Sequence, residues 1–177
     1  MHFSDIKQFI RSGSYEVDVE LTHLELTLQN FETDYGLELN PDFQRGHVWT
    51  EEQQVAYVEF LLKGGVTAKV IYFNSPAFGN PVERDLDETV LCVDGLQRLT
   101  ACLRFVRNEI AVFGYKYNQF GGSPRMMQRL KFNVNSLGKK AEVLQWYLEF
   151  NTGGTIHTEE EINRVRKMLE DELKNVG

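Results

Sequence analysis

The spacing of apolar residues along the chain predicts short strands that alternate with amphipathic helices. At residues 15–21 every second side chain is apolar and the three between are acidic, which predicts a half-buried strand. Shorter apolar runs at residues 37–39, 70–73 and 90–93 predict three more strands. Residues 110–138 show no clear periodicity.

Helical patterns separate and follow these strands. The expected helices lie at residues 4–10, 22–31, 50–62, 96–107, 140–149 and 159–174. Three of them begin with the Ser/Thr-x-x-Glu/Gln pattern of a capping box, at Thr22, Thr50 and Thr158. The predicted fold is therefore α/β (α+β), a small mixed sheet packed by several helices with a helical C-terminal part. Because we find no internal repeat or linker, we expect residues 1–177 to form a single domain.

Composition narrows the class of protein. No run approaches the roughly 20 apolar residues that a membrane helix needs, and the N-terminus lacks the basic-then-apolar order of a signal peptide. Cys92 and Cys102 lie in apolar runs without metal-ligand spacing, so we expect buried, reduced thiols. These features predict a cytoplasmic protein with no membrane partner.

Charge is distributed unevenly. The net charge is −7, yet residues 98–140 carry nine Lys or Arg and a single acidic residue. Residues 1–97 carry six basic and seventeen acidic residues. One interpretation is a basic surface that binds DNA through Arg104, Arg107, Arg125, Arg129 and Lys131. The other is that these charges lie scattered over unrelated faces.

Four aromatic residues fall close together at positions 113–120. Phe113, Tyr115, Tyr117 and Phe120 are interleaved with basic residues such as Lys116. Aromatic rings among cations can stack nucleic-acid bases. The same pattern also fits a β-hairpin that packs on the core, and the residues alone favour this second interpretation.

The clearest local motif joins the apolar run 90–93 to the helix that follows it. Its residues are Asp94-Gly95-Leu96-Gln97-Arg98. Asp94 is positioned to cap the helix, and Gly95 permits a positive φ or a close approach of another chain segment. The first-turn N–H groups of such a helix bind anions, and an arginine beside them suits phosphate. Strand-Asp-Gly-helix is also a common structural turn, and this segment alone favours that interpretation.

Two other segments repeat this logic. Phe43-Gln44-Arg45-Gly46-His47-Val48-Trp49 places an Arg-Gly pair before the helix that Thr50 opens. Phe150-Asn151-Thr152-Gly153-Gly154-Thr155 has the glycines and hydroxyls of a phosphate-binding loop, although it lacks the lysine of a P-loop. A plain turn between helices would have the same composition.

Taken together and in this order, the three segments resemble the N-terminal domain of the GmrSD-type, modification-dependent restriction enzymes. The resemblance runs from about residue 14 to residue 169. It implies a ParB/sulfiredoxin-like domain that binds and hydrolyses nucleoside triphosphates. It also leaves DNA and a host or phage protein as candidate partners in defence or anti-defence.

The resemblance implies roles for particular residues. Asp94, Gln97 and Arg98 would form the catalytic set, with Asp94 also holding Mg²⁺. Phosphate contacts would come from Gln44, Arg45, Gly95, Arg98, Asn151, Thr152 and Gly153. Arg45 and Arg98 would hold phosphate oxygens, and Gln97 or Gln44 would position the attacking water.

The chain departs from the family pattern in two respects. The family signature is Asp-Gly-Gln-Gln-Arg, and Leu96 replaces its first glutamine. Leu96 also stands where related sulfiredoxins carry their reactive cysteine, which excludes cysteine phosphoryl chemistry. Nothing here corresponds to the His-Asn-His nuclease domain of the restriction enzymes, as expected of a freestanding phage or mobile-element member. The alternatives to an NTPase are a non-catalytic nucleotide- or DNA-binding module and a weak ParB-like nuclease that uses Asp94.

Overall fold

The structure, a computed structural model, describes residues 2, 15–44, 46, 48–122, 128–152 and 158–175. These residues form a five-stranded mixed sheet with the strand order β1-β5-β3-β4-β2. The strands are β1 (Tyr15–Glu20), β2 (Leu37–Glu38), β3 (Val70–Asn74), β4 (Val90–Asp94) and β5 (Arg129–Asn135). β1 and β5 are antiparallel, as are β3 and β4, whereas β3 and β5, and β2 and β4, are parallel. The predicted mixed sheet is confirmed.

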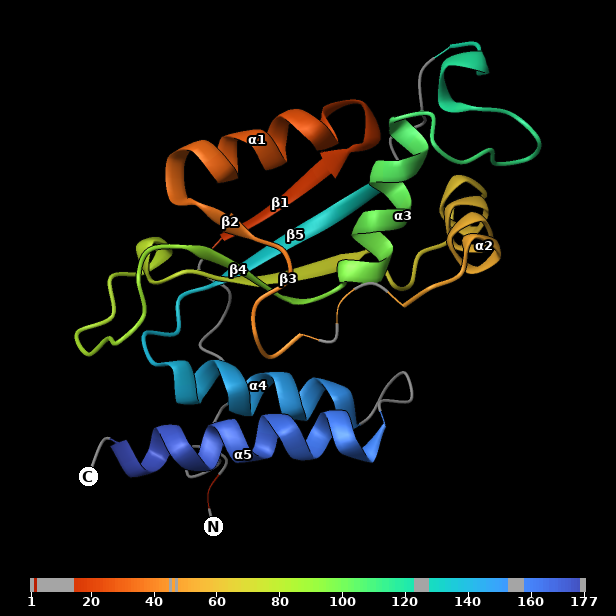
Figure 1. The fold of residues 1–177 in the computed structure, drawn as a ribbon. Helices are drawn as coiled ribbons and strands as arrows, with labels where there is room; N and C mark the ends of the chain where they lie inside the picture. Colours follow the sequence, from red (N-terminus) through yellow and green to blue (C-terminus); the bar gives the residue numbers. More distant parts are fainter. Residues whose placement is uncertain are drawn as a thin grey trace.

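Helices cover both faces of this sheet. They are α1 (Leu24–Tyr35), α2 (Glu51–Leu62), α3 (Leu96–Val106), α4 (Lys140–Thr152) and α5 (Glu159–Asn175). Short 3-10 turns, η2 (Leu21–His23), η3 (Pro76–Phe78) and η4 (Tyr117–Gln119), connect other elements. α4 and α5 lie together against one face, and α1 and α3 lie on the other (Figure 1). The helix predicted at residues 4–10 lies outside the described residues.

The alternation of side chains along the strands divides the core in two. Ile71 and Phe73 of β3 are fully buried in the cluster that α1, α2 and α3 cover. Tyr72, which lies between them in sequence, points to the opposite face and packs with the cluster of α4 and α5. In the same way Cys92 belongs to the first cluster and Val93 to the second. Period-2 alternation thus gives each sheet face its own apolar layer.

Two of the three predicted capping boxes are present. Thr50 caps α2 reciprocally with Gln53, and the Thr158 hydroxyl accepts the Glu161 N–H while the Glu161 carboxylate accepts the Thr158 N–H. The box predicted at Thr22 is wrong. Residues 21–23 form the turn η2 and Thr22 lies inside it, so His23 becomes the N-cap of α1 and makes no side-chain cap.

β5 was not predicted, although it is central to the sheet. Leu130, Phe132 and Val134 alternate with polar residues and are fully buried. Asn133 and Asn135 occupy the positions between them and are also buried, so the strand is covered on both faces. The alternation of residues 129–135 is thus the typical signal of a strand, and it lies within the stretch 110–138 that was predicted to be irregular.

Candidate functional site

The turn between β4 and α3 requires the glycine that it contains. Gly95 has φ +103°, in the left-handed region. A Cβ at this position would lie 2.7 Å from Cδ1 of Ile71 and 3.2 Å from its Cα. Both expectations for Gly95, a positive φ and a close approach, are confirmed.

Asp94 does not cap α3, contrary to the prediction. Gly95 occupies the N-cap position, and no side chain caps the helix there. The left-handed residue separates Asp94 from the first turn, and the Asp94 carboxylate instead pairs with the Arg98 guanidinium one turn later. The first-turn N–H groups of α3 are consequently left without a side-chain acceptor from the N-cap, which is the condition for anion binding at a helix start.

Arg98 is held at the edge of this turn. Its side chain is 16% exposed and that of Asp94 is 33% exposed. Within the described part of the chain, the guanidinium hydrogen-bonds to Asp94 alone. Because an arginine carries five N–H donors, the others can meet a ligand without breaking this pair.

Gln97 fastens the loop before α2 to the start of α3. Its Oε1 accepts the N–H groups of Val48, at 2.9 Å, and Trp49, at 3.0 Å. Its Nε2 donates to the carbonyl of Gly46 at 2.7 Å. This carboxamide therefore positions the loop in the present conformation.

Gln44 fastens the other end of the same loop. Its Nε2 donates to the carbonyls of Cys92, at 3.0 Å, and Val93, at 2.9 Å. From α5, Nη2 of Arg164 donates to the carbonyl of Gln44 at 3.0 Å. The two glutamines thus bring the second motif against the first, some fifty residues away in sequence. Arg45 lies outside the described residues.

A row of polar side chains crosses the sheet beside Asp94. Tyr72 on β3 stands opposite Asp94 on β4 and opposite Asn133 on β5, and Asn133 stands opposite Glu16 on β1. Residues paired in this way point to the same face, and Nδ2 of Asn133 donates to Glu16. The pKa of Tyr72 is raised, mainly by burial and also by the Asp94 and Glu16 carboxylates, while Arg98 lowers it.

This row was not predicted from the sequence. The available signal was the alternation within residues 70–73, which sets Tyr72 on the face opposite Ile71 and Phe73. No pattern in the sequence indicated the strand pairing that places Glu16 in line with Asp94.

The third motif reaches the site through Phe150. Its ring centroid lies 4.6 Å from that of Tyr72. Asn151 lies in the last turn of α4, and its Nδ2 donates to the Tyr147 carbonyl at 2.7 Å, within the helix. Thr152 is the last residue of α4, and Gly153 lies outside the described residues.

The described residues offer little to a metal ion. They contain no group of three His, Cys, Asp or Glu side chains close enough to share a cation. Asp94 supplies one carboxylate, whose Oδ2 is paired with Arg98. Mg²⁺ is commonly held by one or two carboxylates together with substrate phosphates, so Asp94 fits such an ion only if a nucleotide completes its shell.

The basic stretch is largely paired with carboxylates. Seven of the eight cations of this stretch that the structure describes form ion pairs. These are Arg98–Asp94, Arg104–Glu51, Arg107–Glu25, Arg129–Asp18, Lys131–Glu16, Lys139–Glu83 and Lys140–Asp42. Each carboxylate in this set comes from the acidic stretch 1–97, and Arg104 also pairs with Glu109. Among the predicted DNA-binding residues, Arg125 lies outside the described residues. Arg104 lies in α3 and Arg107 at its C-terminal end, whereas Arg129 and Lys131 lie in β5.

Comparison with known proteins identifies the family. Neither the comparison with curated proteins nor that with solved structures returns a match. No helix in the described ranges is long and apolar enough to span a bilayer. Residues 25–175 match the family described as GmrSD restriction endonuclease, N-terminal domain. This match includes all three motifs, and the chain therefore belongs to the family of GmrSD restriction endonuclease N-terminal domains.

Proposed function

We propose that this chain binds the phosphates of a nucleoside triphosphate at the N-terminus of α3. The observation that carries the proposal is the assembly of separate motifs around one helix start. Gly95 turns the chain so that α3 begins without a side-chain cap, and Arg98 lies one turn along. Gln97 and Gln44 fix the loop of the second motif beside them. Backbone donors together with a guanidinium form the usual chemistry of phosphate sites.

Hydrolysis is the first candidate activity, and it rests on the family resemblance. In this proposal Asp94 and the phosphates hold Mg²⁺ between them, and Arg98 stabilises the charge that develops during phosphoryl transfer. Tyr72 lies beside Asp94 and Arg98 and extends the polar surface next to the phosphates. The name of the family, a restriction endonuclease domain, supports action on or near DNA in defence or anti-defence.

A second candidate, binding without turnover, is favoured by the glutamines. Gln97 uses both its oxygen and its nitrogen to hold backbone groups, so it is not available to orient a water molecule in this conformation. Gln44 has its Nε2 engaged by two carbonyls. Leu96, where the family has glutamine, is 7% exposed and packs in the apolar core. A nuclease ranks last, because no cluster of carboxylates accompanies Asp94 within the described residues.

Calorimetric titration with each nucleoside triphosphate, with and without Mg²⁺, tests the binding proposal. Arg98→Ala removes a charge-assisted contact of roughly 3 kcal/mol, so affinity should fall by about 10²-fold. Arg98→Lys keeps the charge but loses the forked geometry, so its affinity should lie between those of the parent chain and Arg98→Ala. Arg166→Ala removes an exposed cation of α5 that bonds to Asn163, and it is the matched control. Unchanged affinity in Arg98→Ala would refute the site.

Phosphate release under the same conditions separates the two candidates. Steady release that Arg98→Ala abolishes supports the hydrolase. Tight binding without release supports the binding module. Leu96→Gln then asks whether the missing family residue is the cause, and Leu96→Met, which conserves volume in the core, is its control. Turnover that appears only in Leu96→Gln would show that the substitution at this position had silenced the enzyme.

A further inference from the structure

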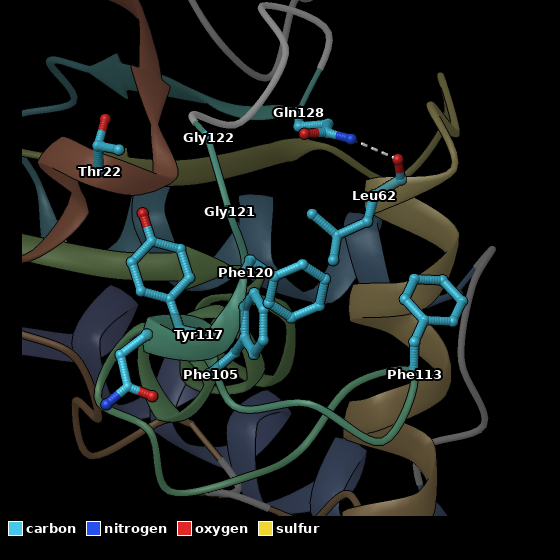
Figure 2. Close-up of a pocket in the computed structure, with 10 residues that line it drawn as sticks. Thr22, Leu62, Phe105, Phe113, Tyr117, Phe120, Gly121, Gly122 and Gln128 are labelled. Carbon is cyan, nitrogen blue, oxygen red and sulfur yellow. Dashed lines mark hydrogen bonds between the residues drawn. The ribbon is translucent and has the colours of Figure 1, made fainter.

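A cavity lies at the opposite end of α3 from the proposed phosphate site. It has a volume of about 400 Å³, within the range of small-ligand sites. The ends of α2 and α3 and the segment after α3 all contribute to its walls, and Phe105 of α3 lies with Tyr117 and Phe120 of that segment (Figure 2). Its lining residues are Thr22, Leu62, Phe105, Phe113, Tyr117, Asn118, Phe120, Gly121, Gly122 and Gln128.

A buried ring fixes the aromatic wall of this cavity. Phe105 is 1% exposed. Tyr117 and Phe120 meet it edge to face, with ring centroids 5.3 and 5.7 Å away. Phe120 itself remains 40% exposed. One side of the wall is therefore anchored in the core while Phe120 keeps a surface open to a ligand.

Phe113 stands at the rim in an unfavourable backbone conformation. Val112 and Tyr115 exchange two backbone hydrogen bonds, so Phe113 and Gly114 form the tip of a two-residue turn. Both tip residues have positive φ, +52° and +80°. Asn, Asp or Gly is the usual residue at the first of these positions, because a bulky side chain is disfavoured there. The ring nevertheless stays 42% exposed, so burial does not explain its presence.

The polar groups around the cavity are neutral. Among the described residues, the ten that line it include no charged side chain. Thr22, Asn118 and Gln128 contribute a hydroxyl and two carboxamides, and Figure 2 shows Gln128 bonded to the Leu62 carbonyl on one side and the Tyr117 hydroxyl directed toward Thr22 on another. The part of a ligand that enters must therefore be uncharged, flat enough to lie against rings, and polar along its edges.

Cations lie outside the cavity rather than in it. Nζ of Lys63 sits 5.1 Å from the centroid of the Phe113 ring at the rim. Lys116 is exposed and lies in the same segment as the aromatic residues. A ligand with a neutral aromatic part and an attached phosphate would meet rings inside and positive charge outside.

We propose that this cavity binds a nucleobase, carried either by a free nucleoside or by an unpaired nucleic-acid strand. Rings stack on either face of any base, and amides can pair with its edge. An aliphatic side chain of a protein partner would gain nothing from the Asn118 carboxamide. The proposal is independent of the phosphate site, because the two lie at opposite ends of α3.

The experiment titrates the full chain with uncharged nucleosides, a 12-nucleotide single strand and the matching duplex, and follows binding by NMR and fluorescence anisotropy. Phe120→Ala removes the stacking ring and should weaken binding about tenfold or more. Gly121→Leu fills the mouth at a position where an added Cβ meets nothing within 4 Å, so it blocks the cavity without disturbing the fold. Leu26→Ala, an exposed apolar residue on α1, is the control.

The proposal is supported if nucleosides or the single strand bind, if both variants weaken this binding, and if Arg98→Ala leaves it intact. Whether the nucleoside or the strand binds more tightly identifies the source of the base. No binding at millimolar concentration, or binding that neither variant changes, overturns it. Loss of this binding in Arg98→Ala would also overturn the proposal, since the ligand would then occupy the phosphate site. Absence of nucleobase binding would not change the expected result of the triphosphate titration, so each proposal can fail without the other.

Discussion

Individual carboxamides carry much of the organisation around the phosphate site. Gln97 makes three hydrogen bonds to backbone groups of residues 46–49, and Gln44 makes two to the end of β4. A glutamine offers donor and acceptor groups on one rigid plane, so a single side chain can satisfy several backbone groups of a loop. Loops without ladder partners need such contacts, because unpaired backbone groups are costly to bury.

We expect Gln97→Ala to destabilise the protein by about 1–3 kcal/mol, because the N–H groups of Val48 and Trp49 lose their acceptor. Gln97→Glu keeps an acceptor for these two N–H groups but sets a second carboxylate oxygen against the Gly46 carbonyl, so it should also destabilise the protein and tests the donor separately. Urea unfolding of the three proteins measures both. Equal stability of Gln97→Ala and the parent chain would mean that the loop does not depend on this residue.

The two cysteines should be inert in the folded protein. Cys92 and Cys102 are fully buried and form no disulfide. Burial raises the pKa of the Cys102 thiol to about 12 and also raises that of Cys92, so neither forms the reactive thiolate at pH 8. A chromogenic disulfide reagent should label neither thiol in native protein and both in guanidinium. Rapid native labelling would show that one of them is accessible.

At the scale of elements, the strand–turn–helix unit of β4 and α3 sets the geometry of the phosphate site. Its turn works only because Gly95 lies close against Ile71 of β3 with a left-handed backbone. The same packing buries Leu96 in the core and leaves Arg98 at the surface edge. The start of α3, its contact with β3 and the position of Arg98 therefore all depend on Gly95.

Gly95→Ala should destabilise the chain by about 2–4 kcal/mol, combining the cost of a left-handed alanine with overpacking against Ile71. Ile71→Val removes Cδ1, the atom nearest the added Cβ. The double variant should recover part of the lost free energy of unfolding. The cost of the left-handed backbone and the close contact with the Ile71 Cα should persist. A double-mutant cycle by urea unfolding measures this coupling, and strict additivity would rule out the contact as the cause.

At the scale of the whole molecule, the acidic and basic stretches of the sequence neutralise one another. The pairs connect strands and helices that are distant in sequence, for example Arg107 with Glu25 and Lys140 with Asp42. Exposed pairs of this kind contribute little stability singly. Their main consequence is that most of the positive charge of the described residues within 98–140 is paired with neighbouring carboxylates.

We therefore expect DNA binding, if measured, to show a shallow dependence on salt. A protein that contacts four phosphates gives a log–log slope near −4, and with most cations already paired we expect a slope shallower than about −2. Fluorescence anisotropy of a labelled duplex between 20 and 200 mM KCl tests this. A steep slope that Arg129→Ala and Lys131→Ala flatten would mean that the pairs with Asp18 and Glu16 open to admit DNA.

The sequence alone determined the elements whose signals are local. Alternation identified β1, short apolar runs identified β2, β3 and β4, and the helical period identified α1 to α5, because these patterns report the environment of each side chain along its own element. The motif Asp94-Gly95-x-Gln97-Arg98 also placed the candidate site, since a glycine between a strand and a helix specifies a particular turn. The capping box predicted at Thr22 shows the limit of local rules. Its sequence pattern competes there with the turn η2, which the buried Leu21 anchors in the core.

Only the tertiary structure decided which distant residues meet. The order β1-β5-β3-β4-β2 brings Glu16 and Asn133 into line with Tyr72 and Asp94, and no pattern within any one segment encodes that order. It also decided that the glutamines hold a loop and that the basic stretch pairs with the acidic one. The physical reason is that strand pairing, side-chain hydrogen bonds and ion pairs depend on contacts between elements, whereas periodicity reports only the environment of one element at a time.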